Sequence, residues 1–117
     1  MYQGDAAAAL DLYDGVFADF RILERDAGED GKIRMARAEL GGHRINLIDT
    51  PPVHDFTFTP SVSFFVEMHS EEALDAAFEK LSEGGKVLMP LDGYDFSPRF
   101  GWVQDTFGVS WQLSLVE

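Results

Sequence analysis

The sequence of 117 residues contains no cysteine, few basic residues and no long apolar run. The absence of cysteine excludes disulfides, thiolate nucleophiles and thiolate metal sites. Nine lysine and arginine residues stand against 21 aspartate and glutamate residues. The net charge of −12 argues against nucleic acid as a partner, because phosphate groups would be repelled. No segment approaches the roughly 20 apolar residues that span a bilayer, so we expect a cytoplasmic protein with no membrane partner.

The residues that are present are those of a folded domain. The hydrophobic content is 45% and the aromatic content is 13%. A chain of this length buries enough apolar surface to fold without disulfides or metals. We therefore expect residues 1–117 to form a single domain.

The first half of the chain has the pattern of one helix followed by three strands. Asp5 is a natural N-cap for a helix whose apolar stripe is Ala6, Ala9, Leu10 and Tyr13. Alternating residues then predict strands at DFRILERDA, IRMARAEL and HRINLID, separated by turns at GEDG and GG.

The same order returns after TPPVHDFTFTP, a segment with three prolines that reads as a linker. SVSFFVEM predicts a strand, and Ser70 caps a helix over EEALDAAFEKLSE that Gly84 and Gly85 end. After the helix we expect a short strand at KVLMP, a loop at LDGYDFSPR, and strands at FGWVQD and VSWQLSLVE. The buried stripe of this second helix is Leu74, Ala77, Phe78 and Leu81.

The two halves match as an internal repeat. The helical stripes align with a shift of 68 residues, and the terminal hairpins align with a shift of 66, which places Asn46 onto Gln112. The leading strand is clear only in the second half. We expect one module at about 1–50, a linker at about 51–60 and a second module at about 61–117. Neither half can bury its sheet face alone, so the two should assemble into one curved sheet.

Four segments carry a resemblance to a known family: GDAAAALDLY, HDFTFTPSVSFFVE, KLSEGGKVLMPL and FGWVQDTFGVSWQL. Together they resemble the PhnB-like branch of the vicinal oxygen chelate superfamily, which includes glyoxalase I, extradiol dioxygenases and the bleomycin-resistance proteins. The resemblance implies an α+β fold in which two βαβββ modules form a curved, cup-shaped mixed sheet with helices on the convex face. It also implies a homodimer.

Sequences of this branch are often labelled 3-demethylubiquinone-9 3-methyltransferases. A methyltransferase that uses S-adenosylmethionine normally has a βαβ unit with a glycine-rich first turn. The sequence contains no such unit, and it gives the label no support.

Strand alternation separates the residues that face the helices from those that face the cup. In the last strand, Trp111 and Leu113 share one face, and Ser110, Gln112 and Ser114 share the other. The apolar faces should pack against the helices, and the mixed faces should line the cup.

The resemblance also points to the positions where metal-dependent relatives of the glyoxalase I type hold their ion. Those relatives carry a glutamate ligand in two strands of an I-E-L type pattern, where this chain has Asn46 and Gln112. A histidine ligand at the start of the fifth strand is matched by Ser61. Two amides and a hydroxyl lack the carboxylate or imidazole that such ions need. We expect no metal and no other cofactor.

Hydrogen-bonding and aromatic side chains remain as candidates for binding a small molecule. The loop that contains Tyr94 is either a lid or a surface loop, and the sequence leaves both open. Glu67 and Tyr94 are the candidate acid–base residues, although a solvated glutamate at a strand end is the simpler interpretation of Glu67. The predicted ligand-binding residues are Asn46, Ser61, Ser63, Phe65, Tyr94, Phe96, Arg99, Trp102 and Gln112.

Three functions are consistent with these observations. The first is a protein that binds a small polar or aromatic organic molecule in the cup without the usual metal site. The second is a divergent glyoxalase-type enzyme, such as a lyase, isomerase or dioxygenase, acting on a small oxygenated substrate. The third is a structural homodimer with a vestigial pocket. The sequence does not decide whether the protein is an enzyme.

Overall fold

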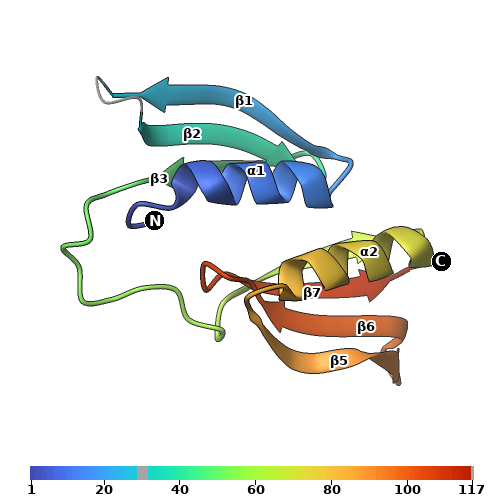
Figure 1. The fold of residues 1–117 in the computed structure, drawn as a ribbon. Coiled ribbons are helices and arrows are strands. Elements are labelled where there is room, and N and C mark those ends of the chain that lie inside the picture. Colours follow the sequence, from blue (N-terminus) through green and yellow to red (C-terminus); the bar gives the residue numbers. More distant parts are fainter. Residues whose placement is uncertain (29–31, 117) are drawn as a thin grey trace. The chain divides into compact units, whose positions relative to one another are not determined.

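The computed structural model describes residues 1–28 and 32–116 (Figure 1). The chain divides into two compact units, Met1–Thr57 and Phe58–Glu117. Each unit packs one helix on one sheet. Within the described residues, no helix is long and apolar enough to cross a membrane.

The first unit contains the helix α1 (Ala6–Val16) and the strands β1 (Phe20–Ala27), β2 (Ile33–Leu40) and β3 (His43–Ile48). The strands form an antiparallel sheet in the order β1-β2-β3. Tyr2 adds a single parallel bridge to Asp49, just beyond the end of β3. The predicted turn at GEDG falls largely on residues 29–31, which lie outside the described residues.

The second unit contains β4 (Ser63–Met68), the helix α2 (Glu71–Ser82), and the strands β5 (Lys86–Tyr94), β6 (Ser97–Gln104) and β7 (Ser110–Leu115). Its sheet has the order β4-β7-β6-β5. The leading strand β4 pairs with the last strand β7 in parallel, and the other pairs are antiparallel. The residues between β3 and β4 contain no helix or strand.

The repeat predicted from the sequence is present in the strand pairing. In the second unit Met68 is the parallel partner of Leu115, and in the first unit Tyr2 is the parallel partner of Asp49. Tyr2 and Asp49 precede Met68 and Leu115 by 66 positions, the same shift that aligns the terminal hairpins. Tyr2 therefore occupies the place of the last residue of β4.

The helical stripes are confirmed by burial. All four predicted residues of each helix are buried, and α1 is followed by Phe17, which is 1% exposed. The Ser70 hydroxyl caps α2 by accepting a hydrogen bond from Ala73 N at 3.2 Å, as predicted. The prediction for Asp5 is wrong in one respect: it occupies the N-cap position of α1, but its side chain makes no capping bond.

One predicted loop is instead part of a hairpin. The segment LDGYDFSPR was expected to leave the sheet, but β5 continues to Tyr94 and β6 begins at Ser97. Three register shifts in the β5–β6 pairing absorb the irregular residues. Pro90 is tolerated because β5 lies at the edge of the sheet, where a missing N–H breaks no ladder.

A buried carboxylate holds the turn between β6 and β7. Asp105 is 3% exposed, and its Oδ1 accepts hydrogen bonds from the backbone N–H groups of Phe107 (2.9 Å) and Val109 (3.0 Å). Its Oδ2 accepts a hydrogen bond from Trp111 Nε1 at 2.9 Å. Trp111 itself is 1% exposed and makes a ring contact with Phe64. The core tryptophan is thus fixed from its polar end.

Replacing Asp105 by alanine leaves the two backbone donors and the Trp111 indole N–H without their acceptor. We expect Asp105→Ala to lower the free energy of unfolding by about 3 kcal/mol, since unpaired donors in a buried environment are costly. Urea denaturation followed by tryptophan fluorescence measures this change. If the loss of stability were the same in a Trp111→Phe background, the Asp105–Trp111 bond would contribute nothing.

Two glycines offer a matched test of the packing between β5 and the β6–β7 turn. A Cβ atom on Gly85 would lie 2.1 Å from the Gln104 carbonyl oxygen, whereas a Cβ atom on Gly15 in α1 would meet nothing within 4 Å. We expect Gly85→Ala to destabilise the protein by about 2–3 kcal/mol because backbone must move. Gly15→Ala should instead stabilise it by roughly 0.5–1 kcal/mol through helix propensity. Equal effects in urea denaturation would contradict this packing.

Candidate functional site

The sheet of the second unit has one face covered by α2 and one face that α2 does not cover. A Cβ atom on Gly101 would collide with the Phe78 ring of α2, which places Gly101 on the covered face. Its neighbours Phe100 and Trp102 therefore point to the opposite face. Residues that pair in register lie on the same face of a sheet, so the partners of Phe100 and Trp102 on the other strands also belong to the uncovered face. We call this face the mixed face.

The mixed face consists of three rows of side chains that each cross all four strands. Each row is given in the strand order β4, β7, β6, β5. The first row is Ser63, Ser110, Gln104 and Lys86, and the second row is Phe65, Gln112, Trp102 and Met89. The third row is Glu67, Ser114, Phe100 and Asp92. Four predicted ligand-binding residues (Ser63, Phe65, Trp102 and Gln112) and the acid–base candidate Glu67 are thus brought together.

A chain of hydrogen bonds fixes Trp102 on this face. Trp102 Nε1 donates to Ser110 Oγ at 2.7 Å, and the Ser110 hydroxyl is also hydrogen-bonded to the hydroxyl of Ser63. An indole N–H can only donate, so Ser110 Oγ must be the acceptor. Ser110 is 1% exposed, while Ser63 and Trp102 are half-buried. The indole ring is therefore held in one orientation with part of its surface open to solvent.

The middle row places an amide beside two aromatic rings. Gln112 is half-buried and lies between its register partners Phe65 and Trp102. Within residues 32–116 its side chain has no hydrogen-bond partner, whereas Gln104 Nε2 donates to the Gly108 carbonyl at 3.1 Å. Gln112 is thus the amide on this face that keeps both its donor and its acceptor available.

Four aromatic rings lie close together near the third row of the mixed face and the turn of the β5–β6 hairpin. Phe96 stacks on Tyr94 with the ring planes 13° apart, and both rings meet Phe100 edge-on. Phe65 lies 6.2 Å from Phe100 between ring centroids. Phe96 is 64% exposed and Phe65 is 54% exposed. We call these four residues the aromatic end; Phe65, Tyr94 and Phe96 present ring surface to solvent, and Phe100 is buried beneath them.

The Tyr94 hydroxyl is engaged within its own strand. It donates a hydrogen bond to the Pro90 carbonyl at 2.8 Å, which fixes the ring for stacking on Phe96. Glu67 is exposed at the end of β4. The two acid–base candidates are therefore a phenol with a backbone partner and a carboxylate in solvent.

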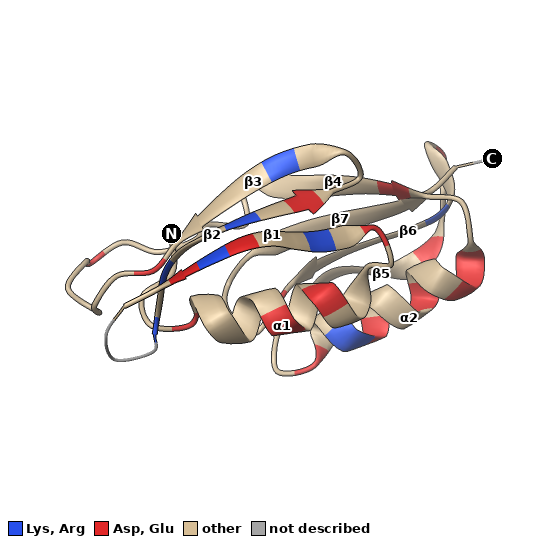
Figure 2. Cartoon of the chain, turned by 90° about the horizontal axis from the view of Figure 1, so that it is seen from above, with Lys and Arg blue, Asp and Glu red and all other residues tan. Residues whose placement is uncertain are grey.

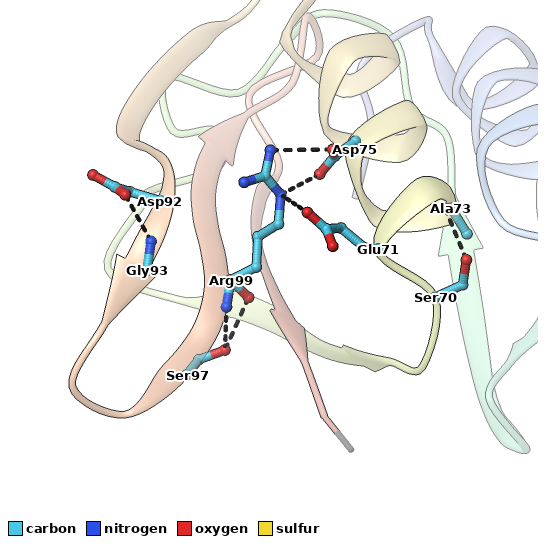
Figure 3. A network of polar contacts seen from close by, with 8 residues as sticks. All are labelled: Ser70, Glu71, Ala73, Asp75, Asp92, Gly93, Ser97 and Arg99. Carbon is cyan, nitrogen blue, oxygen red and sulfur yellow. Dashed lines mark hydrogen bonds and ion pairs between the residues drawn. The ribbon is translucent and has the colours of Figure 1, made fainter.

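Arg99, another predicted ligand-binding residue, extends to the face covered by α2 (Figure 3). Its guanidinium binds both carboxylate oxygens of Asp75, with Nη2 at 3.1 Å from Oδ2, and lies 3.6 Å from Glu71. The hydrogen bonds to Asp75 raise the pKa of Arg99 above its usual value, with smaller contributions from nearby carboxylates. Arg99 ties β6 to α2 and is not gathered with the mixed face.

Ser61 precedes β4 and lies outside the rows. Its hydroxyl is hydrogen-bonded to Thr59 Oγ at 3.0 Å, and its backbone N–H donates to the same oxygen. It is exposed. Its local partner makes Ser61 part of a turn that leads into the strand.

Asn46 belongs to the first unit, where it lies on β3 opposite Arg37. The neighbouring residues form a ladder of opposite charges between β1 and β2, in which Arg37 is 3.6 Å from Glu24 and Arg21 is 3.3 Å from Glu39. Figure 2 shows the alternating basic and acidic segments on β1 and β2. Asn46 is exposed beside this ladder.

The three positions that hold metal ligands in related proteins do not fit a metal here. Asn46, Ser61 and Gln112 supply only neutral amide and hydroxyl oxygens, and Ser61 already binds Thr59. Within the described residues, no three or more histidine, aspartate or glutamate side chains gather as a metal site. We assign no chemistry to a metal at these positions.

The predicted ligand-binding residues did not include Phe100, Ser110 or Asp92, although strand alternation had placed Ser110 on the face expected to line the cup and Asp92 belongs to the segment considered as a lid. Alternation within FGWVQD places Phe100 on the same side as Trp102, and this signal was present in the sequence. Asp92 could not be found this way, because β-bulges in β5 change the alternation before it reaches Asp92.

Comparisons with known proteins agree with this architecture. A family model described as 3-demethylubiquinone-9 3-methyltransferase matches residues 1–114. The PhnB protein from Bacillus cereus is 38% identical over 99% of this chain and 95% of its own, with a TM-score of 0.92. A comparison with curated proteins gave no match.

Two more distant structures share the fold. Protein PA1353 from Pseudomonas aeruginosa is 23% identical, with a TM-score of 0.80 over 97% of this chain and 91% of its own. A glyoxylase/bleomycin resistance protein/dioxygenase domain from Frankia sp. is 18% identical, with a TM-score of 0.66 over 100% and 91%. With its full-length family match and its glyoxalase-like α+β fold, the chain belongs to the PhnB-like family described as 3-demethylubiquinone-9 3-methyltransferase.

Proposed function

We propose that this protein binds a small organic molecule, with an aromatic part and a polar part, on the mixed face of the second unit. We propose that this binding uses no metal at Asn46, Ser61 and Gln112. The observation that carries the proposal is the middle row. Gln112, with both its donor and its acceptor available, stands between Phe65 and Trp102. An apolar surface with a few fixed polar groups is the usual composition of a small-molecule site.

The fixed orientation of the partly exposed Trp102 ring supports a role of this ring in ligand binding. Its ring is anchored through Nε1 to Ser110, so little side-chain entropy is lost when a planar ligand stacks on it. Gln112 can then donate to and accept from the polar group of the same ligand. Stacking supplies the affinity, and the amide supplies the orientation.

Methyl transfer, which the family description names, is not the activity we propose. The sequence has no glycine-rich turn after a strand of a βαβ unit, the arrangement that usually holds the cofactor of such enzymes. An enzyme that works by acid–base chemistry is also less well supported than a binding protein. Tyr94 donates to Pro90, and Glu67 stands in solvent at the strand end.

Tryptophan fluorescence tests the proposal, because Trp102 is half-buried on the mixed face and Trp111 is buried on the other. We expect the neutral phenol 4-tert-butylphenol to change the emission of the protein with a saturable dependence on concentration. Trp102→Phe should abolish this response while Trp111 still emits. A response that persists in Trp102→Phe, or no binding by calorimetry, would contradict the proposed site.

Gln112→Leu separates the role of the amide from that of the rings. The leucine fills a similar volume but cannot bond the phenol hydroxyl, so we expect affinity to fall about five- to ten-fold, the value of roughly one hydrogen bond. Gln104→Leu is the matched control on the first row, since that amide is already bonded to Gly108. Equal affinities for Gln112→Leu and the unchanged protein would remove Gln112 from the site.

A further inference from the structure

The aromatic end of the mixed face offers ring faces of the kind that attract cations. The Phe96 ring stacks on Tyr94, and Phe96 is 64% exposed, so much of its ring surface is open to solvent. Phe100 fixes this pair by meeting both rings edge-on. The face of an aromatic ring carries negative electrostatic potential, and a cation within about 6 Å of its centre is stabilised.

Three carboxylates lie in the row of Phe100 or in the adjoining hairpin turn. The third row of the mixed face begins with Glu67 and ends with Asp92, with Phe100 between them. Asp95 stands in the hairpin turn between Tyr94 and Phe96. All three are exposed, and in the described part of the chain none of them forms an ion pair.

Basic residues of the second unit are few and lie elsewhere. The unit contains ten acidic and three basic residues, the basic ones being Lys80, Lys86 and Arg99. Lys80 is in α2, and Lys86 ends the first row, at the opposite end of the face from Glu67 and Asp92. Arg99 attracts Asp92 through space, but its hydrogen bonds go to Asp75. Among the described residues of the second unit, no basic side chain therefore forms an ion pair with Glu67, Asp92 or Asp95.

From this arrangement we infer that the ligand carries a positive charge: an aromatic molecule with a substituted ammonium group, whose cation rests on Phe96 among Glu67, Asp92 and Asp95. The inference depends on the proposed function, because it assumes that the mixed face binds a small molecule. It adds the class of ligand, since a neutral or anionic molecule of the same shape gains nothing from these carboxylates.

Three para-substituted phenols test the inference on the full chain: (4-hydroxyphenyl)trimethylammonium, its neutral isostere 4-tert-butylphenol, and the smaller anion 4-hydroxybenzoate. In calorimetric titrations at low salt, we expect the cation to bind about three- to ten-fold more tightly than the neutral isostere, and the anion more weakly than both. The advantage of the cation should shrink in 0.5 M salt, because exposed charges are screened.

Two variants identify the groups responsible. Neutralising the three carboxylates together (Glu67→Gln, Asp92→Asn, Asp95→Asn) should remove most of the advantage of the cation and leave 4-tert-butylphenol unchanged. Removing three exposed charges from α2 and its C-cap (Glu72→Gln, Glu79→Gln, Glu83→Gln) is the matched control and should leave the ratio of affinities as it was. Phe96→Leu should lower the affinity for the cation more than that for the isostere.

The outcomes separate the two proposals. If 4-tert-butylphenol binds and the cation binds no more tightly, the inference is overturned and the proposed function stands. If 4-hydroxybenzoate binds most tightly, the inference is likewise overturned. If none of the three ligands binds, both proposals fall.

Discussion

The hydrogen bonds of the Asp105 carboxylate determine what each face of the second sheet presents. They stabilise the turn over residues 105–109 and fix the buried Trp111 indole through its N–H group. The turn sets Gln104 opposite Ser110, and every later pair between β6 and β7 follows from that first one. Because side chains alternate, a slip of one residue would send Trp111 outward and Gln112 inward. The three rows of the mixed face exist only in this register.

The two faces of this sheet differ in whether their charged side chains form ion pairs. On the face covered by α2, Arg99 is bound by Asp75 and approached by Glu71, so charges there are paired and connect a strand to the helix. On the mixed face, Glu67 and Asp92 stand at the two ends of a row that also holds Ser114 and Phe100, and neither carboxylate forms an ion pair in the described part of the chain. The ion pairs on the covered face connect β6 to α2, whereas the carboxylates of the mixed face are those to which we assign the proposed ligand.

The repeat has kept its topology while its exposed faces have diverged. Both units place a parallel leading segment beside the last strand, and the pairs Tyr2–Asp49 and Met68–Leu115 occupy equivalent positions. The uncovered face of the first unit is a ladder of opposite charges, and that of the second is aromatic and amide-rich. Topology depends on buried apolar stripes, which both halves retain, and the exposed side chains are free to change without loss of the fold.

The sequence by itself determined the helices, most of the strands, the repeat and the family, because these depend on local periodicity and on motifs that span the chain. It also determined that Gln112 and Trp111 point in opposite directions, since alternation in an unbroken strand requires it. It did not determine the path of residues 91–99, where bulges interrupt alternation and allow a hairpin in place of a loop. Only the tertiary structure decided that Arg99 turns to α2, that Ser110 anchors Trp102, and that Glu67 and Asp92 flank Phe100. These contacts connect residues on different strands and helices. They depend on the register between strands, which no local sequence pattern encodes.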